Sequence, residues 1–117
     1  MNTVCHVEFD CTDLERSQKF YEGLFGWKFR AFTDTMVVFG TDEGHIGGLE
    51  RVEKVAAGSS PSIWFDVDDV DAYVSKVDSL GGKLIREKSR VPHVGWSAQV
   101  ADPDGNPVGL VQFVEEN

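Results

Sequence analysis

Three polar side chains near the start of the chain have the types and the spacing to perform acid–base or metal chemistry. Residues 4–11 read VCHVEFDC, so His6, Glu8 and Asp10 occupy alternate positions of a segment rich in valine and phenylalanine. Such a segment is typical of a β-strand, whose alternate side chains share one face. A histidine near neutral pKa, beside carboxylates, can act as a general acid or base. We therefore take His6 as the candidate catalytic residue; a hydrogen-bonded structural histidine is the competing interpretation.

Two further carboxylates, Asp102 and Asp104, lie in the stretch DPDGN near the C-terminal end. An EF-hand calcium loop needs oxygen ligands at its positions 1, 3, 5 and 12 and a glycine at position 6. Counted from Asp102, Gly105 is fourth and Phe113 is twelfth, so the stretch does not fit that loop. Proline, glycine, asparagine and aspartate together favour a tight turn. We expect a structural turn that leads into a strand.

The first half of the chain contains the elements that would position the histidine. The strand at 4–11 is followed by Thr12 and Glu15, which have the spacing of a capping box at the start of a helix. Gly26 is expected to end that helix, and further strands are expected near 27–32, 35–40 and 45–52. The spacing of five residues predicts that they share one face of this helix. They are Leu14, Ser17, Phe20, Tyr21 and Leu24.

The second half repeats this pattern. A strand at 61–67 precedes Asp68 and Asp71 in the capping positions, and Gly81 and Gly82 are expected to stop the helix before a strand from Lys83. The apolar positions predicted to line one face of this helix are Val70, Tyr73, Val74, Val77 and Leu80. By strand alternation Ile63, Phe65 and Val67 are expected in the core.

The two halves align without gaps at a shift of 56 residues. The positions that meet identical residues are Phe9, Asp10, Asp13, Leu24, Gly26 and Arg30. Beyond them the shift becomes 61, and the five extra residues are expected in a longer loop around 88–95, KSRVPHVG. Recurrence at a fixed shift indicates duplicated units that share a core. The sequence thus predicts one α+β domain, residues 1–117, made of two βαβββ modules at 1–56 and 57–117.

Composition narrows the class of function. The chain has 20 acidic and 11 basic residues and a net charge of −9. Such a charge opposes binding to nucleic acid or to anionic membrane surfaces. Neither an apolar run of about 20 residues nor a secretory signal is visible. Cys5 and Cys11 lack CxxC spacing, and we expect reduced thiols in a cytoplasmic protein.

Several stretches together resemble the vicinal oxygen chelate superfamily, which includes glyoxalase, extradiol dioxygenases and bleomycin-resistance proteins. They are DLERSQKFYEGLFGW at 13–27, VDDVDAYVSKVDSLGGK at 67–83, VGW at 94–96 and DPDGNPVGL at 102–110. The resemblance implies the glyoxalase/bleomycin resistance fold, with the two modules in a pseudo-twofold arrangement that forms a barrel-like cavity. In that superfamily the substrate, and in some members a divalent metal, binds inside. Because chains of the superfamily commonly pair, and because small modules leave sheet edges exposed, we expect a homodimer.

The resemblance places metal ligands at His6, Gly48, Ser62 and Gly109. Glycine has no ligating side chain and serine is a poor ligand for first-row metals, which prefer imidazole, carboxylate or thiolate. We therefore predict that the usual metal site is lost and that no cofactor is bound. An alternative set, His6 with Glu8 and Glu50, stays open because alternation places these groups on related faces.

The same reasoning predicts the wall of a ligand cavity. Alternation places Ser62, Trp64 and Asp66 on one strand face, and an indole offers a flat apolar surface for a ligand. Trp96 follows the longer loop and is a candidate for the rim. The predicted ligand-binding residues are Glu8, Gly48, Glu50, Ser62, Trp64, Trp96 and Gly109.

Two functions follow from these predictions. The first is a binding module that holds a small organic molecule in a cavity lacking the usual metal ligands. The second is a lyase or isomerase of a small oxygenated metabolite, which uses His6 as acid or base or a relocated divalent metal.

Overall fold

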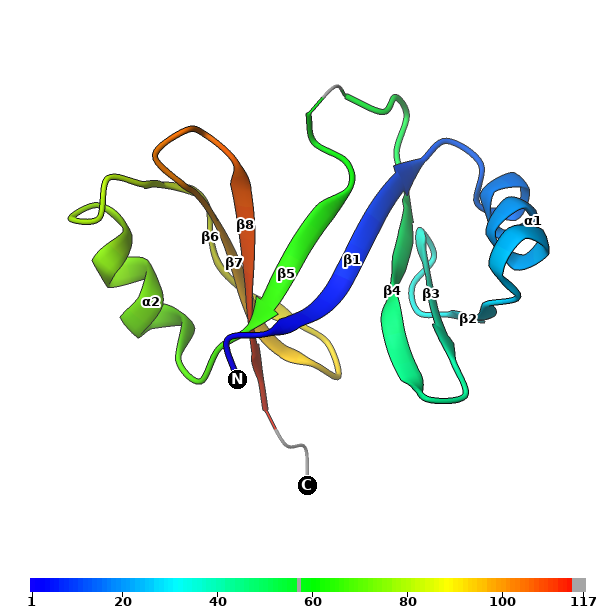
Figure 1. Cartoon of the computed structure of the whole chain (residues 1–117), viewed down its shortest axis with the longest axis horizontal. Helices are drawn as coiled ribbons and strands as arrows, with labels where there is room; N and C mark the ends of the chain where they lie inside the picture. Colours follow the sequence, from blue (N-terminus) through cyan, green and yellow to red (C-terminus); the bar gives the residue numbers. More distant parts are fainter. Residues whose placement is uncertain (57, 115–117) are drawn as a thin grey trace. The chain divides into compact units, whose positions relative to one another are not determined.

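The computed structural model describes residues 1–56 and 58–114, and its elements follow the order βαβββ twice (Figure 1). The first set is β1 (Val4–Cys11), α1 (Leu14–Phe25), β2 (Lys28–Ala31), β3 (Met36–Thr41) and β4 (Gly44–Arg51). The second set is β5 (Ser62–Asp66), α2 (Val70–Val77), β6 (Lys83–Val91), β7 (Gly95–Ala101) and β8 (Pro107–Phe113). The predicted α+β class and the repeated module are confirmed.

The chain divides into two compact units, Cys5–Ser62 and a second unit that joins Met1–Val4 to the chain from Ile63 onward. We call them the first and second modules. The first residues belong with the second module because Asn2 and Thr3 form backbone hydrogen bonds with Asp66, at the end of β5.

The strands of the two modules are ordered alike. The order is β2-β3-β4-β1 in the first module and β6-β7-β8-β5 in the second. β1 pairs with β4, and β5 with β8, in parallel, whereas the other neighbours within each module are antiparallel. Each module is therefore an open four-stranded sheet, and neither sheet closes on itself into a barrel.

Each helix covers one face of its own sheet. In the first module Cys11, Phe39 and Leu49 are buried under α1, and Trp27 stacks on Phe39 with ring centroids 4.5 Å apart. In the second module the buried cluster under α2 consists of Val67, Val70, Ala98, Val100 and Leu110. We call the opposite side of each sheet, which faces away from that module's helix, the far face.

The helix starts lie one residue later than predicted. Asp13, not Thr12, caps α1, and its carboxylate accepts a hydrogen bond from the Arg16 backbone N–H at 3.1 Å. Asp69 caps α2 in the same way. Both Thr12 and Asp13 are good capping types, so the sequence alone did not decide between them.

The helix ends differ in outcome. The prediction that Gly26 ends α1 is confirmed, because Gly26 adopts the left-handed conformation with φ of 72°. α2 ends earlier than predicted, at Val77, and the chain turns through the following residues before Gly82.

Ile63, which was predicted to lie in the core, is exposed, and so are three apolar side chains of the predicted helix faces. Phe20 is 61% exposed, Leu24 60%, Leu80 73% and Ile63 43%. Leu80 lies beyond the end of α2, so it is not on the face that the helix presents to the sheet. Phe20 and Leu24 are four residues apart on α1, and they lie outside the contact that Leu14 and Tyr21 make with the core.

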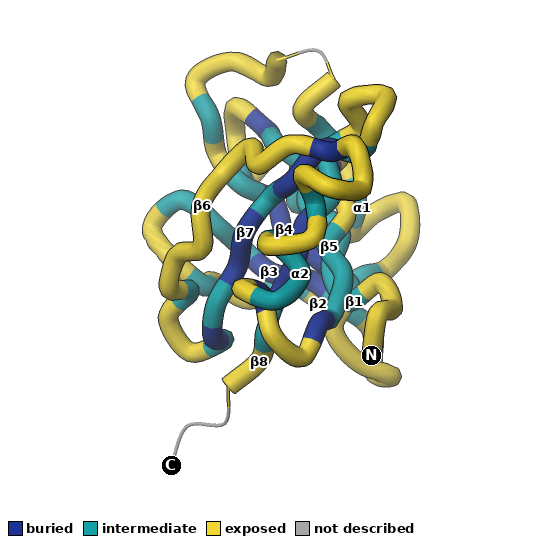
Figure 2. The backbone as a smooth tube through the Cα atoms, turned by 90° about the vertical axis from the view of Figure 1, so that its left-hand side faces the viewer, coloured by how far each residue is buried: buried dark blue, intermediate teal, exposed yellow. Residues whose placement is uncertain are grey.

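The expected long loop is instead an extension of β6. This strand continues to Val91 and forms a hairpin with β7, with a short turn at 92–94 in which His93 has a φ of 65°. β6 lies at the sheet edge of its module and is almost wholly exposed, whereas β7 is largely buried (Figure 2). The lysine and arginine side chains of β6 are typical of an edge strand that resists pairing with another chain.

Candidate functional site

The far face of the first module carries the polar residues of β1. Phe9 packs in the core under α1, so by alternation His6, Glu8 and Asp10 share the far face. The strand register places Asp10 beside Glu50 and places Glu8 in a row that crosses the sheet. The members of that row are Glu8, Gly48, Val38 and Arg30.

A β-bulge adds a second histidine to this face. Phe39 pairs with Gly47 and the next residue, Gly40, pairs with His45, so Ile46 is an extra residue in β4. Ile46 packs on the helix side. The bulge thereby reverses the alternation and turns His45 onto the far face, as bulges near functional sites commonly do. His45 was not among the predicted site residues. The adjacent glycines at 47 and 48 were the signal that could have indicated a bulge.

His6 is held between two polar partners. Its Nε2 lies 3.1 Å from Glu8 Oε1, and its Nδ1 lies 2.8 Å from His45 Nε2. An ionised carboxylate only accepts hydrogen bonds, so His6 Nε2–H donates to Glu8. In a neutral His6, Nδ1 is then the acceptor and His45 Nε2–H the donor, a tautomer assigned from the network. The His6 and Glu8 side chains are only 18% and 21% exposed, so the imidazole is fixed in orientation.

The carboxylates beside this pair are shifted toward their neutral forms. Partial burial raises the pKa of Glu50, and the charges of Glu8 and Asp10 add to the effect, against a hydrogen bond from Thr35. Burial and the Glu8 charge also raise the pKa of Asp10. Asp10 and Glu50 therefore bind protons more tightly than ordinary carboxylates, because they are partly buried and lie on one face with other negative charges.

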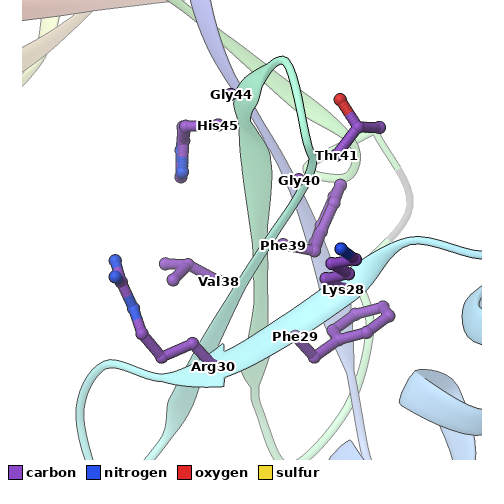
Figure 3. A pocket seen from close by; sticks show the side chains of 9 residues that line it. All are labelled: Lys28, Phe29, Arg30, Val38, Phe39, Gly40, Thr41, Gly44 and His45. Carbon is purple, nitrogen blue, oxygen red and sulfur yellow. The ribbon is translucent and has the colours of Figure 1, made fainter.

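A shallow hollow of about 380 Å³ adjoins the face at its β2–β3 edge. Figure 3 shows that its lining splits between the two sides of the strands: His45, Val38 and Arg30 lie on one side, and the rings of Phe29 and Phe39 on the other. Of the two paired histidines only His45 lines the hollow, and Arg30 lines it from the same side of the strands. Arg30 is the second residue that the sequence analysis did not select.

The four positions at which the resemblance places metal ligands do not form a metal site. A Cβ built on Gly48 would already lie 3.3 Å from the His6 ring and from the Met36 sulfur, so the glycine is needed for close packing. At Gly109 a Cβ would collide with the indole of Trp64. Ser62 is buried, and its hydroxyl is a weak ligand. The donor set at these positions reduces to His6, which cannot hold a divalent ion alone.

The alternative set of His6, Glu8 and Glu50 does not converge either. Within residues 1–56 and 58–114, no three His, Cys, Asp or Glu side chains come close enough to hold a metal ion. Glu50 is instead hydrogen-bonded to Thr35 at 3.0 Å.

The predicted ligand residues of the second module fall on both faces of its sheet. Trp64 pairs with Gly109, and its indole covers that glycine on the far face, with the Arg86 guanidinium 5.5 Å from the ring. Trp96 packs against the core cluster under α2, beneath Lys88 and Arg90. The structure therefore brings Trp64 and Gly109 together and places Trp96 on the opposite side of the sheet.

The DPDGN stretch is a turn, as predicted. Asp102 Oδ1 accepts hydrogen bonds from the backbone N–H groups of Asp104 and Asn106, each at 2.9 Å, and Gly105 has a φ of 87°. Hydrogen bonds from Asn106 lower the pKa of Asp102. Its Oδ2 accepts from the Asn106 side-chain amide at 2.9 Å, so both carboxylate oxygens bind groups of the turn itself and the role is structural.

This fold and site define a glyoxalase-type module. The chain matches the Glyoxalase/Bleomycin resistance protein/Dioxygenase superfamily over residues 3–110, and it belongs to that superfamily. It is 33% identical over 114 residues to a glyoxylase-like domain-containing protein of Didymella fabae, covering 86% of this chain and 85% of that one.

More distant relatives are longer. The chain is 30% identical over 111 residues to the anthracycline biosynthesis protein DnrV of Streptomyces peucetius, and this match covers 80% of the chain but only 40% of DnrV. The chain therefore spans less than half of that relative.

Solved structures share the fold. A superfamily member from Vibrio splendidus 12B01 aligns with a TM-score of 0.69 and 20% identity, covering 94% of this chain and 99% of that one. Methylmalonyl-CoA epimerase from Mycobacterium tuberculosis aligns with a TM-score of 0.72 and 18% identity, covering 96% and 88%. At these identities the likeness establishes the fold alone. Across the described residues, neither helix has the length and apolarity to cross a membrane.

The contact between Trp64 and Gly109 generates the first prediction. Gly109→Ala should lower the free energy of unfolding by about 1–3 kcal/mol, because the added methyl group must displace the indole. In a Trp64→Ala background the same substitution should cost much less, and urea unfolding of the four variants measures the coupling. Gly23→Ala, where nothing lies within 4 Å of the new methyl, is the control. Equal costs in the two backgrounds would contradict the packing.

The second prediction concerns pH. Because the folded-state pKa of Glu50 is raised, the folded protein binds that proton more tightly, and its stability falls as pH rises from about the ordinary value of 4.5. Glu50→Gln keeps an acceptor for Thr35 and should make the protein more stable at pH 7, by roughly 0.5 kcal/mol.

Urea unfolding between pH 4.5 and pH 7 measures this effect. The difference between parent and variant should shrink toward the acid end of the range. Glu22→Gln on the exposed surface of α1 is the control and should show no such trend. A parent more stable than the Glu50 variant at pH 7 would contradict the interpretation.

Proposed function

We propose that this chain binds a small organic molecule on the far face of the first module, with His6 as the central polar group and without a metal. The observation that carries the proposal is the network in which Glu8 and His45 hold His6 in one orientation, part-buried on a sheet face lined by small and polar residues. His6, held in this way, orients the His45 ring, whose Nδ1 then faces a ligand as a defined acceptor without an ordering cost. Membership of the superfamily supports a binding function, since the name of the superfamily includes a resistance protein as well as enzymes.

A second candidate function, a lyase or isomerase, is favoured by the same network. A proton taken up by the histidine pair leaves its positive charge next to Glu8, at 3.1 Å from His6. His45 Nδ1 would take a proton from a weakly acidic C–H or O–H group of a bound metabolite while His45 Nε2 passes its own proton to His6 Nδ1, so His6 would act as the base through His45. The two functions differ in whether the ligand is converted.

The third prediction tests both functions with a thermal-shift screen of small metabolites. A true ligand at a hundredfold excess over Kd should stabilise the folded chain by about 2.7 kcal/mol, which corresponds to roughly ten degrees in Tm. The shift should fall sharply in His6→Gln, because the variant loses the imidazole that links Glu8 to His45 and fixes the orientation of the His45 ring.

His93→Asn is the matched control, since it removes an imidazole in the turn before β7, where a positive φ suits asparagine. Incubation of the ligand with the parent then separates the functions: no conversion supports the binding module, and conversion abolished in His6→Gln supports the enzyme. A ligand whose shift survives unchanged in His6→Gln would contradict both.

We also infer that two copies of the chain associate. Phe20, Leu24 and Phe25 on α1 are 61%, 60% and 56% exposed, an apolar stretch that another surface could cover. The fourth prediction is a sedimenting species of twice the 13.0 kDa chain mass at micromolar concentration. Phe20→Glu with Leu24→Glu should shift it to the monomer, and Lys19→Glu, a neighbouring polar position on the helix, should not. A parent that sediments as a monomer would contradict the inference.

A further inference from the structure

We propose that Arg30 and His45 recognise a small organic acid that carries a hydrogen-bond donor, such as a hydroxyl group, next to its carboxylate. The inference rests on the proposed function and adds a ligand class to it. Both residues line the hollow at the β2–β3 edge, and Figure 3 shows their side chains extending toward each other over Val38.

Arg30 supplies the charge for the carboxylate. In the part of the chain that the structure describes, its guanidinium makes no hydrogen bond or ion pair, although the protein has nearly twice as many acidic as basic residues. By contrast Lys28, two positions earlier on β2, is paired with Asp42. A guanidinium offers two parallel N–H donors that match a carboxylate.

His45 supplies an acceptor beside that charge. Its Nε2–H is occupied by His6, so its Nδ1 carries a lone pair. Burial, together with the neighbouring His6 and Arg30, lowers the pKa of His45, and the ring is therefore neutral at neutral pH. A hydroxyl group adjacent to a carboxylate can donate to Nδ1 while the carboxylate occupies the guanidinium. A plain carboxylate would leave this acceptor unpaired.

The carboxylates of the same face do not prevent an anion from binding here. Glu8 and Arg30 lie at opposite ends of the row that runs through Gly48 and Val38. Three strand spacings separate them by about 14 Å, which exceeds the Debye length of about 8 Å at physiological salt. The acidic and basic ends of the face thus act on different parts of a ligand, and the buried Val38 provides an apolar floor between them.

Three probes of nearly equal size test this inference: glycolate, acetate, which lacks the hydroxyl group, and glycolamide, which lacks the charge. Each is titrated into the whole chain at pH 7.5 and constant ionic strength, with the side-chain NMR signals of Arg30 and His45 as the readout. Glycolate should shift both signals saturably below 100 mM, and acetate and glycolamide should bind at least fivefold more weakly. No saturable shift with glycolate, or equal affinity for glycolate and glycolamide, would overturn the proposal.

Variants assign the effect to the residue. Arg30→Gln should weaken glycolate binding at least fivefold, whereas Lys28→Gln, which removes a cation that lines the same hollow but is paired with Asp42, should leave the affinity within twofold. Because Arg30 is exposed, Arg30→Gln should retain the amide spectrum of the folded chain. Unchanged affinity in Arg30→Gln would overturn the proposal. The metabolite screen with His6→Gln is independent, so either result can fail while the other stands.

Discussion

The arrangement of each module depends on the parallel pairing of its first strand with its fourth. In the first module this pairing brings the Val7 carbonyl so close to residue 47 that any Cβ there would collide with it, and glycine is the residue present. Parallel neighbours require a long crossover, and α1, β2 and β3 supply it. Because the helix of the crossover covers one side of the sheet, the polar positions of β1 are left together on the other side. The location of the candidate site thus follows from a backbone contact rather than from the histidine itself.

Much of this could be predicted from local patterns. Alternation in VCHVEFDC correctly separated His6, Glu8 and Asp10 from Phe9, since a strand allows only two directions for its side chains. The repeat between the halves was visible because the helix caps Asp13 and Asp69, and the later Gly26 and Gly82, recur at a shift of 56 residues. The position of Trp64 on the far face followed from the same rule of alternation.

Other features depend on contacts that a local pattern does not contain. Alternation fails wherever a strand gains one residue, so the sequence did not place His45 beside His6. An amphipathic helix shows which side is apolar but not how wide the covering sheet is, so the exposure of Phe20 and Leu24 could not be predicted from the shared face. A sequence also does not show what fills the space beside a glycine. In the structure the His6 ring lies against Gly48 and the Trp64 indole lies against Gly109.

The bulge at Ile46 shows how the chemistry of a sheet face can change without any change of side chain. One additional residue in β4 shifts the phase of that strand, so that the residues before it are presented to the side opposite from the one their numbering implies. Insertion of one residue into β3 between Phe39 and Gly40 would give Ile46 a partner, restore the phase and direct His45 toward α1, leaving His6 with Glu8 alone. In this hairpin, chain length rather than residue identity sets how many imidazoles the face displays. Relatives that differ by one residue between β3 and β4 would therefore differ in their polar surface even where every aligned side chain is the same.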